Sequence, residues 1–524
     1  MSAQRPPVPS WFCSSLQDGH RQRSSMPGVL HSQPAARFII SLYEICILLN
    51  EMIELAPDGG ARPETWPRGQ REHGMLKTDH GKGSAGGDAS ENKSFPKSKA
   101  LHERACETLA GGVSSQFRAA GAPHPMFYVR AEGAQIWDAD DNALLDFTLS
   151  QGPCILGHSH PELTGRVNES LKVGQLFAGQ HMDELELAEA VKACVPAAER
   201  VRFAVSGSEA AHALLRLARY VTGRPKFIKF IGHYHGWLDN VSFSINPPRD
   251  ETNAPPRPVA WSGGVPAALA DDVIVLPWND LALVEEAMAT HGTQIAAIIT
   301  EPVMCNQGCI EPLPGFLEGL SRLCDEHGSA LIFDEIITGF RLGASGAQGH
   351  FGVTPDMALF GKALGAGFPL AALVGREKFM APLANGEVYH AGTLNASNAS
   401  IAAGRAVIDV MGRNNGEGYR HIRRLGCRMR DGIAAIGDQG RLDVRVQGPG
   451  PMFHMGFSER ARATSYDHVL DYDKAMYGRF CAGMLARGVR LIERGLWYVS
   501  LAHTDEDIDH ALATVREVLE EIGH

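Results

Sequence analysis

The segment ALIFDEIITGFR, residues 330–341, decides the fold class. An uninterrupted apolar run ends there in two acidic residues, Asp334 and Glu335. Strands buried on both faces have such runs, and they are typical of parallel sheets covered by helices. Acidic side chains at the carboxyl end of a parallel strand lie where open α/β sheets bind ligands. The segment therefore predicts a buried parallel strand with a ligand site at its end, with capping of the next helix as the alternative role for the carboxylates.

The same pattern recurs along the chain and predicts an α/β protein. Stretches with helical periodicity, such as Glu209–Tyr220 and Pro314–His327, separate short apolar runs, which indicates a mostly parallel central sheet in a large domain. The runs expected to form its strands are 201–207, 226–232, 273–278, 295–302, 330–336, 357–362 and 370–375.

A smaller α+β domain is predicted after a long helix that begins near residues 401–411. Four further apolar runs follow it, and Thr504 with Asp507 three residues later predicts the capped start of a final helix. Those runs are 444–448, 452–457, 489–493 and 497–502. We expect residues 98–150 to be the N-terminal part of the small domain, 151–400 the large domain, and 401–524 the C-terminal part of the small domain.

Residues 1–97 differ in amino-acid composition from the rest of the chain. They are rich in Ser, Pro, Gln, Gly and Lys, and such segments bury too little apolar surface to offset the entropy of ordering. We predict a disordered N-terminal extension, and the alternative is a translation start at Met52 or Met75. The apolar run 38–49 contains Glu44 and lacks a small-residue cleavage site, which disfavours a signal peptide.

Composition narrows the class of protein. The 524 residues include 49 Lys and Arg and 60 Asp and Glu, a net charge of −11, which is unfavourable for binding nucleic acid. No apolar run approaches the roughly 20 residues that span a bilayer, so we expect no membrane partner. Ten scattered cysteines form no disulfide or zinc pattern, so we expect reduced thiols, a cytoplasmic protein and no metal site.

Three further segments carry chemistry. Lys362 follows an apolar strand and precedes a Gly-rich turn, and an ammonium in apolar surroundings has a lowered pKa that suits Schiff-base formation. Ser206, Gly207 and Ser208 join a strand to a helix, where backbone N–H groups favour a phosphate. Tyr234 follows another strand and could stack on a planar ring. Each signal has an ordinary structural alternative when it is taken alone.

Together these segments resemble the class-III aminotransferases, which are pyridoxal-phosphate (PLP) enzymes of fold type I, and most closely the glutamate-1-semialdehyde 2,1-aminomutase branch. The likeness runs from about Leu101 to Gly523. It implies that Lys362 holds the cofactor covalently and that Asp334 pairs with its pyridine nitrogen. It implies cofactor contacts from Ser206, Gly207, Ser208, Tyr234, Asn306 and Ile336, and from Thr393 to the cofactor of the neighbouring subunit in a homodimer with shared active sites. Arg118 matches an arginine that holds the substrate carboxylate.

The resemblance leaves two reactions open. Gln151 stands where the aminomutase pattern has Trp, and Gly495 where it has Glu, while GTLNASNAS also departs from that pattern. These departures favour ping-pong transamination between a carboxylate-bearing amino compound and a keto or aldehyde acceptor. The alternative is the aminomutase reaction, in which the amino group moves within glutamate 1-semialdehyde to give 5-aminolevulinate. A cofactor-binding protein without turnover is disfavoured, because such a protein would need neither Lys362 nor Asp334.

Overall fold

The computed structural model describes residues 93–249 and 257–524. The extension predicted for residues 1–97 therefore falls almost entirely outside the described residues, and so does the apolar run 38–49. Helix α2 begins at Pro96, two residues before the boundary expected at residue 98.

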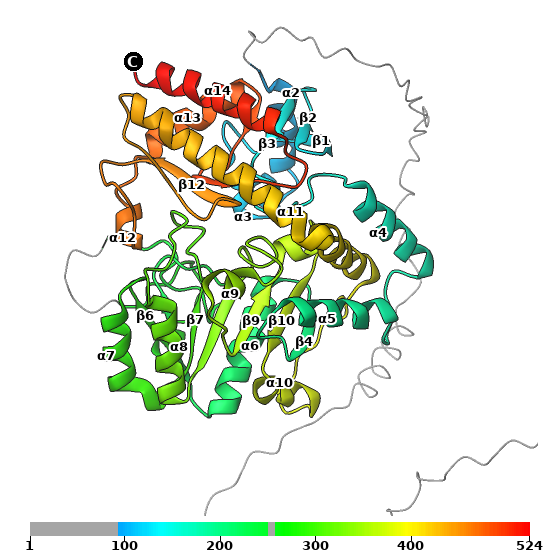
Figure 1. Ribbon diagram of the computed structural model, residues 1–524, viewed down its shortest axis with the longest axis vertical. Coiled ribbons are helices and arrows are strands. Elements are labelled where there is room, and N and C mark those ends of the chain that lie inside the picture. The colour runs from blue at the N-terminus through cyan, green and yellow to red at the C-terminus, as the bar shows by residue number, and fades with distance from the viewer. Residues whose placement is uncertain (1–92, 250–256) are drawn as a thin grey trace, which may run out of the picture. The chain divides into compact units, whose positions relative to one another are not determined.

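A seven-stranded sheet forms the centre of the layer at the bottom of Figure 1, in the order β4-β10-β9-β8-β7-β5-β6. All seven runs expected to be strands of the large domain lie in it. Their bounds are β4 Arg200–Ala204, β5 Lys226–Phe230, β6 Val273–Leu276, β7 Ile295–Thr300, β8 Ala330–Glu335, β9 Met357–Phe360 and β10 Ala371–Gly375. Strand β10 is antiparallel to both neighbours, and the other paired strands run parallel. The prediction of a mostly parallel α/β sheet is confirmed.

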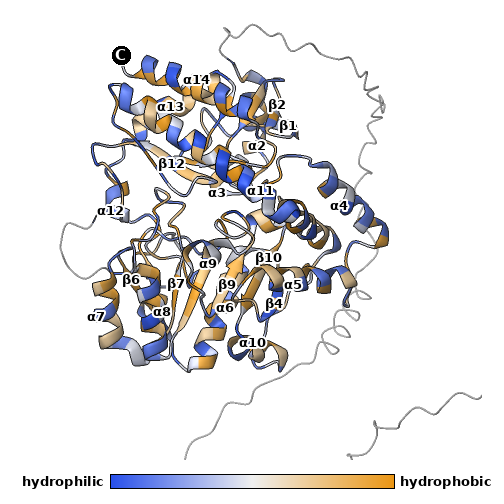
Figure 2. Ribbon diagram, in the orientation of Figure 1, coloured by the Kyte–Doolittle hydropathy of each residue, from blue (hydrophilic) through white to orange (hydrophobic). Residues whose placement is uncertain are grey.

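Helices cover both faces of this sheet, which explains the continuous apolar runs. Alternate side chains of β8 enter different clusters: Phe333 belongs to the cluster that includes Leu320 of α8 (Phe316–His327), and Ile332 to the cluster that includes Leu214 of α6 (Gly207–Thr222). Figure 2 shows the central strands in the hydrophobic colour.

Two smaller sheets occupy the other layer of Figure 1. One has the order β1-β2-β3-β13, and β13 from the C-terminal part pairs in parallel with β3 from the N-terminal part. The other has the order β11-β12-β14. The bounds are β1 Tyr128–Glu132, β2 Gln135–Asp138, β3 Ala143–Asp146, β11 Val444–Gln447, β12 Met452–Phe457, β13 Val489–Arg490 and β14 Leu496–Tyr498. The two ends of the described chain are thus joined in one sheet, while the domain boundaries at 150 and 400 stay predictions.

The remaining helices connect these strands. The α-helices are α2 Pro96–Cys106, α3 Gln116–Ala119, α4 Pro161–Val173, α5 Met182–Cys194, α7 Leu281–His291, α9 Gly346–Phe351, α10 Glu377–Ala384, α11 Asn398–Gln439, α12 Tyr466–Val469, α13 Lys474–Ala486 and α14 Asp505–Ile522. Short 3₁₀ turns are η1 Ala110–Gly112, η2 Ala267–Asp272, η3 Gly292–Gln294 and η4 Lys362–Gly365. Within the described ranges, no helix is both long and apolar enough to cross a bilayer.

Helix α11 links the two layers. Its backbone leaves the helical region at Arg413–Gly416. Before this break, Gly404 lies against Leu187 of α5. After it, Gly432 lies against Leu512 of α14. The two halves of α11 therefore pack on different layers.

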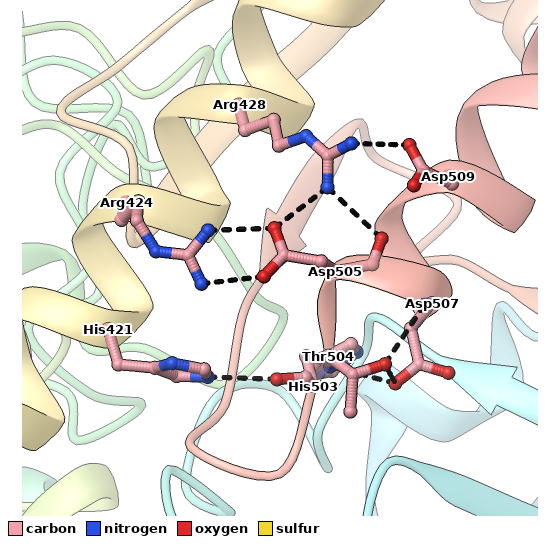
Figure 3. A network of polar contacts seen from close by, with 8 residues as sticks. All are labelled: His421, Arg424, Arg428, His503, Thr504, Asp505, Asp507 and Asp509. Carbon is pink, nitrogen blue, oxygen red and sulfur yellow. Dashed lines mark hydrogen bonds and ion pairs between the residues drawn. The ribbon is translucent and has the colours of Figure 1, made fainter.

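A polar network fixes α14 on the second half of α11 (Figure 3). Arg424 donates two hydrogen bonds to Asp505 at 2.7 and 2.8 Å, and Arg428 bridges Asp505 and Asp509. The backbone N–H of Asp507 donates to the Thr504 hydroxyl at 3.1 Å, and that of Thr504 donates to the Asp507 carboxylate at 2.9 Å. The predicted capping residue is confirmed, and both bonds of a capping box are present.

Candidate active site

A cavity of about 370 Å³ collects most of the predicted site residues. It opens at the carboxyl ends of β8 and β9, beside the start of α6. The predicted residues in its wall are Ser206, Gly207, Ser208, Tyr234, Asn306, Asp334, Ile336 and Lys362. Segments up to 156 residues apart in the chain are thus brought to one edge of the sheet, as open α/β sheets do at their ligand sites.

Lys362 stands in the connection between β9 and the antiparallel strand β10. It begins η4 with a positive φ of 40°, a backbone conformation that a side-chain-bearing residue rarely adopts. Burial, followed by the positive charge of Arg494, lowers the pKa of the Lys362 amine to about 8. An amine with this pKa is partly neutral near physiological pH and can act as a nucleophile or a base.

Asp334 is held at the end of β8 by two hydrogen bonds. His235 donates from Nδ1 to its Oδ2 at 2.8 Å, and the Ile336 backbone N–H donates to its Oδ1 at 3.1 Å. The Asp334 residue is only 5% exposed and His235 only 1%. Burial lowers the pKa of His235 despite the neighbouring carboxylate, so the ring holds Asp334 in place as a neutral donor.

The start of α6 forms a compact anion site. Ser206 caps the helix by accepting from the Glu209 N–H, and Glu209 accepts from the Ser206 N–H in return. This pairing occupies the Glu209 N–H and leaves those of Gly207 and Ser208 for a ligand at the helix end, where the helix dipole favours negative charge. A Cβ on Gly207 would come within 2.6 Å of Ile336 Cδ1, so glycine allows this turn to approach the floor of the cavity.

The buried carboxyl group of Glu301 holds the backbone of Tyr234 in place. Glu301 accepts from the Tyr234 N–H at 2.7 Å and from the Cys305 N–H at 3.1 Å, and it lines the same cavity. Burial, followed by the charge of Asp334, raises the pKa of Glu301 to about 8. One carboxyl group therefore joins the loop that carries Tyr234 to the loop that carries Asn306.

Two predicted residues lie outside the cavity wall. Arg118 is exposed on the short helix α3, and Thr393 is exposed in the loop before α11. Phe117, next to Arg118, makes an edge contact with Tyr234 at a ring-centroid distance of 5.6 Å. Helix α3 thus lies next to Tyr234, which lines the cavity.

The sequence reasoning missed three residues of this site. His235 donates to Asp334, and His233 accepts from the Glu301 N–H at 3.0 Å. Glu301 could have been predicted from the sequence, because it directly follows the apolar run that forms β7. No sequence pattern marks Arg494 as a site residue. Its guanidinium donates to Asn306 at 3.3 Å from a position 188 residues away in sequence.

Comparison with known proteins agrees with this geometry. Residues 117–519 match the family described as Aminotransferase class-III. The chain belongs to the class-III aminotransferase family. It is 40% identical over 428 residues to a protein named glutamate-1-semialdehyde 2,1-aminomutase from Desulfovibrio desulfuricans, covering 80% of this chain and 99% of that protein.

Solved structures of transaminases share the fold. An omega-transaminase from Sphaerobacter thermophilus superposes with a TM-score of 0.76 at 29% identity, covering 81% of this chain and 97% of that one. A transaminase with PLP bound gives 0.74 at 27% identity, covering 82% and 98%. The chain is therefore a fold type I transferase that acts on amino groups of small molecules, and the predictions of family, fold class and enzyme class are confirmed.

Proposed function

We propose that this class-III aminotransferase is a PLP-dependent transaminase that works by a ping-pong reaction. An amino donor gives its amino group to the enzyme and leaves as a carbonyl compound, and a keto or aldehyde acceptor then takes that group. The observation that carries PLP-dependent amino transfer is the meeting of Lys362 and Asp334 in one cavity, and Gly495 favours the ping-pong reaction over the aminomutase reaction. A lysine amine and a buried carboxylate at the two ends of a planar cofactor are what amino transfer requires.

The residues present fit PLP. The anion site at the start of α6 suits the phosphate through Ser206, Gly207 and Ser208. Asp334 offers a buried carboxylate for the pyridine nitrogen, and Asn306 a polar side chain for the phenolic oxygen. Ile336 and Tyr234 supply apolar surface for the two ring faces. When bound, PLP provides an aldehyde for the amine and a ring that accepts the electron pair from the substrate Cα.

The chain's own side chains then have separate tasks. Asp334, fixed by His235, favours a proton on the atom that it faces. Lys362, as a partly neutral amine, would take a proton from the substrate Cα and return it to the carbon on the other side of the amino nitrogen. Arg494 adds to the site a guanidinium, which suits a carboxylate by two parallel hydrogen bonds, and Arg118 on α3 adds another. We therefore propose carboxylate-bearing amino compounds as substrates.

The aminomutase reaction is the second candidate, because a protein of that name is 40% identical to this chain. One position argues against it. Gly495 has a φ of 93°, and a Cβ there would lie 2.7 Å from the Met455 carbonyl oxygen. The glutamate of the aminomutase pattern could not enter here without moving the backbone.

A homodimer is the proposed working unit. Thr393 is exposed, and we propose that it completes the phosphate site of a second copy. Large apolar side chains are also exposed near it, and such surfaces mark interfaces. Their exposed fractions are 78% for Tyr389, 59% for Leu394 and 66% for Met182.

A cytoplasmic location is supported by the eight cysteines in the described residues, which are all free.

Purified holoenzyme tests this function directly. Candidate donors are offered with pyruvate or 2-oxoglutarate, and glutamate 1-semialdehyde is offered alone. Transamination requires an added keto acid, whereas turnover of glutamate 1-semialdehyde without one would establish the aminomutase reaction instead. Lys362→Ala should remove both the visible absorption band of the bound cofactor and activity, and a variant that keeps both would refute the assignment of Lys362.

A further inference from the structure

A lysine without a task in the proposed reaction is buried on strand β5, directly before the loop that carries Tyr234. Lys229 is 0% exposed, and an amine in such a position is costly unless hydrogen bonds satisfy it. It donates to the backbone carbonyl of His233 at 3.2 Å and to that of Phe243. These two carbonyls stand near the start and at the end of the loop, so a single side chain joins both ends of it.

The peptide unit between His233 and Tyr234 is held at both of its polar atoms. Its carbonyl oxygen accepts from Lys229, and its N–H donates to Glu301 at 2.7 Å. The backbone N–H of Glu301 donates in turn to the His233 ring at 3.0 Å. A peptide unit is planar, so fixing both of its polar atoms fixes the orientation of the whole plane. The backbone from which the Tyr234 side chain projects therefore has little freedom to rotate.

Three consecutive residues of this loop serve three parts of the cofactor cavity. Tyr234 lines the cavity, and His235 donates to Asp334 at 2.8 Å. Gly236 has a φ of 105°, and a Cβ there would lie 2.8 Å from the Ser208 Cα. A shift of the loop would therefore move the aromatic ring, the support of the buried carboxylate and the contact with the anion site together.

The two hydrogen bonds of Lys229 do not depend on its charge. Burial lowers the pKa of its amine to about 7, against the opposing effect of the Glu301 charge. The ammonium has three N–H groups, and the neutral amine keeps two, one for each carbonyl. Both ends of the loop can thus be held on either side of neutral pH.

We propose that Lys229 is a positioning residue, which holds the loop of Tyr234, His235 and Gly236 in the geometry that binds PLP. The inference rests on the proposed function, because it takes Tyr234 as the residue on one face of the PLP ring. Lys229 lies outside the cavity wall, so it acts through the loop.

Hydrogen exchange of the full chain, measured without added cofactor, tests the contact itself. Lys229→Met keeps the length of the side chain but cannot donate, which leaves the peptide unit held only at its N–H. We expect the Tyr234 amide to exchange at least about tenfold faster, because a hydrogen bond to a charged group contributes on the order of tenfold to an opening equilibrium. The matched control is Lys226→Met: Lys226 is on the same strand but donates to the Asp271 carbonyl of η2. It should leave this amide unchanged.

The bound cofactor reports the positioning role. PLP is titrated into the cofactor-free chain, and the visible circular dichroism per bound PLP is recorded, because it depends on how the ring is seated. We expect Lys229→Met to weaken PLP binding about tenfold, since binding must then order the loop, and to change the circular dichroism. Lys226→Met should do neither. The effect should be smaller in a Tyr234→Leu background, because groups that act through one loop are not additive. Lys229→Gln gives the same comparison if Lys229→Met does not fold.

Two results would overturn the proposal. The first needs no variant: a Tyr234 amide that exchanges in the parent chain as fast as the amide of Trp237, whose side chain is 68% exposed. The second is a Lys229 variant that binds PLP with the affinity and circular dichroism of the parent. A parent chain that bound no PLP would refute the proposed function itself, which distinguishes that failure from these two.

Discussion

The amine of Lys362 should titrate far below the range of an exposed lysine. Its pKa is lowered from 10.5 to about 8 by burial and then by Arg494. At pH 7 about 10% of such an amine is neutral, compared with about 0.04% for a lysine with a pKa of about 10.4. The structure therefore predicts ~250-fold more nucleophilic amine at this position, which corresponds to about 3 kcal/mol.

Acylation of the cofactor-free protein measures this directly. Trace acetic anhydride is added between pH 6 and 11, and each lysine peptide is quantified by mass spectrometry, with the exposed Lys192 as the internal comparison. Because only the neutral amine reacts, the rate at Lys362 should rise about tenfold per pH unit below 8 and level off above it. The rate at an ordinary lysine continues to rise to about pH 10.

The source of the shift can be tested in the same assay. Arg494→Met removes the nearby charge but keeps the bulk of the side chain, so the pKa of Lys362 should rise. It should stay below 10.5, because burial is the larger cause. A Lys362 rate that climbs to pH 10 in the parent protein would refute the reasoning, and an unchanged plateau in Arg494→Met would exclude Arg494 as a cause.

Three other perturbations have defined outcomes. Gly207→Ala should cost about 1–3 kcal/mol of stability and weaken cofactor binding, because its Cβ meets Ile336 Cδ1, and Ile336→Val, which lacks that atom, should restore part of both in thermal unfolding and cofactor titration. Glu301 binds its proton more tightly in the folded state, so the free energy of unfolding should fall by on the order of 3–5 kcal/mol as pH rises from 4.5 to about 8. Glu301→Gln should remove this decrease. If urea unfolding shows the same pH dependence of the free energy for both proteins, the assignment of the decrease to Glu301 is wrong. Thr504→Ala should cost about 1 kcal/mol in urea unfolding by removing the cap of α14, whereas Thr504→Ser should cost little.

Much of the fold could be predicted, because the strands of the large sheet are covered on both faces. Each then appears as a continuous apolar run, and all seven runs are strands of one sheet. The direction of β10 could not be predicted, because a doubly covered strand has the same pattern whether it runs parallel or antiparallel. Strand β1 was not predicted either, since most of its residues are exposed and no apolar pattern marks them.

The site was predicted where it follows strand ends and missed where it depends on contacts across the fold. Lys362, Asp334, Tyr234 and the start of α6 each follow an apolar run, so the sheet edge gathers them. Arg494 reaches Asn306 from the C-terminal layer, and no local pattern encodes that contact. The role of His235 depends on its partner Asp334, 99 residues away, which its own neighbours in sequence do not reveal.

The break in α11 has a mechanical consequence. The first half of this helix is seated on α5, and the second is fastened to α14 by Gly432 and by the two arginines of Figure 3. A continuous helix would transmit any tilt of one layer to the other as a rigid lever. Because the helical backbone is interrupted at Arg413–Gly416, the two halves are connected by a hinge. Rotation of the layer that carries Arg494 can be absorbed at this hinge without bending the helix that lies against the Lys362 turn.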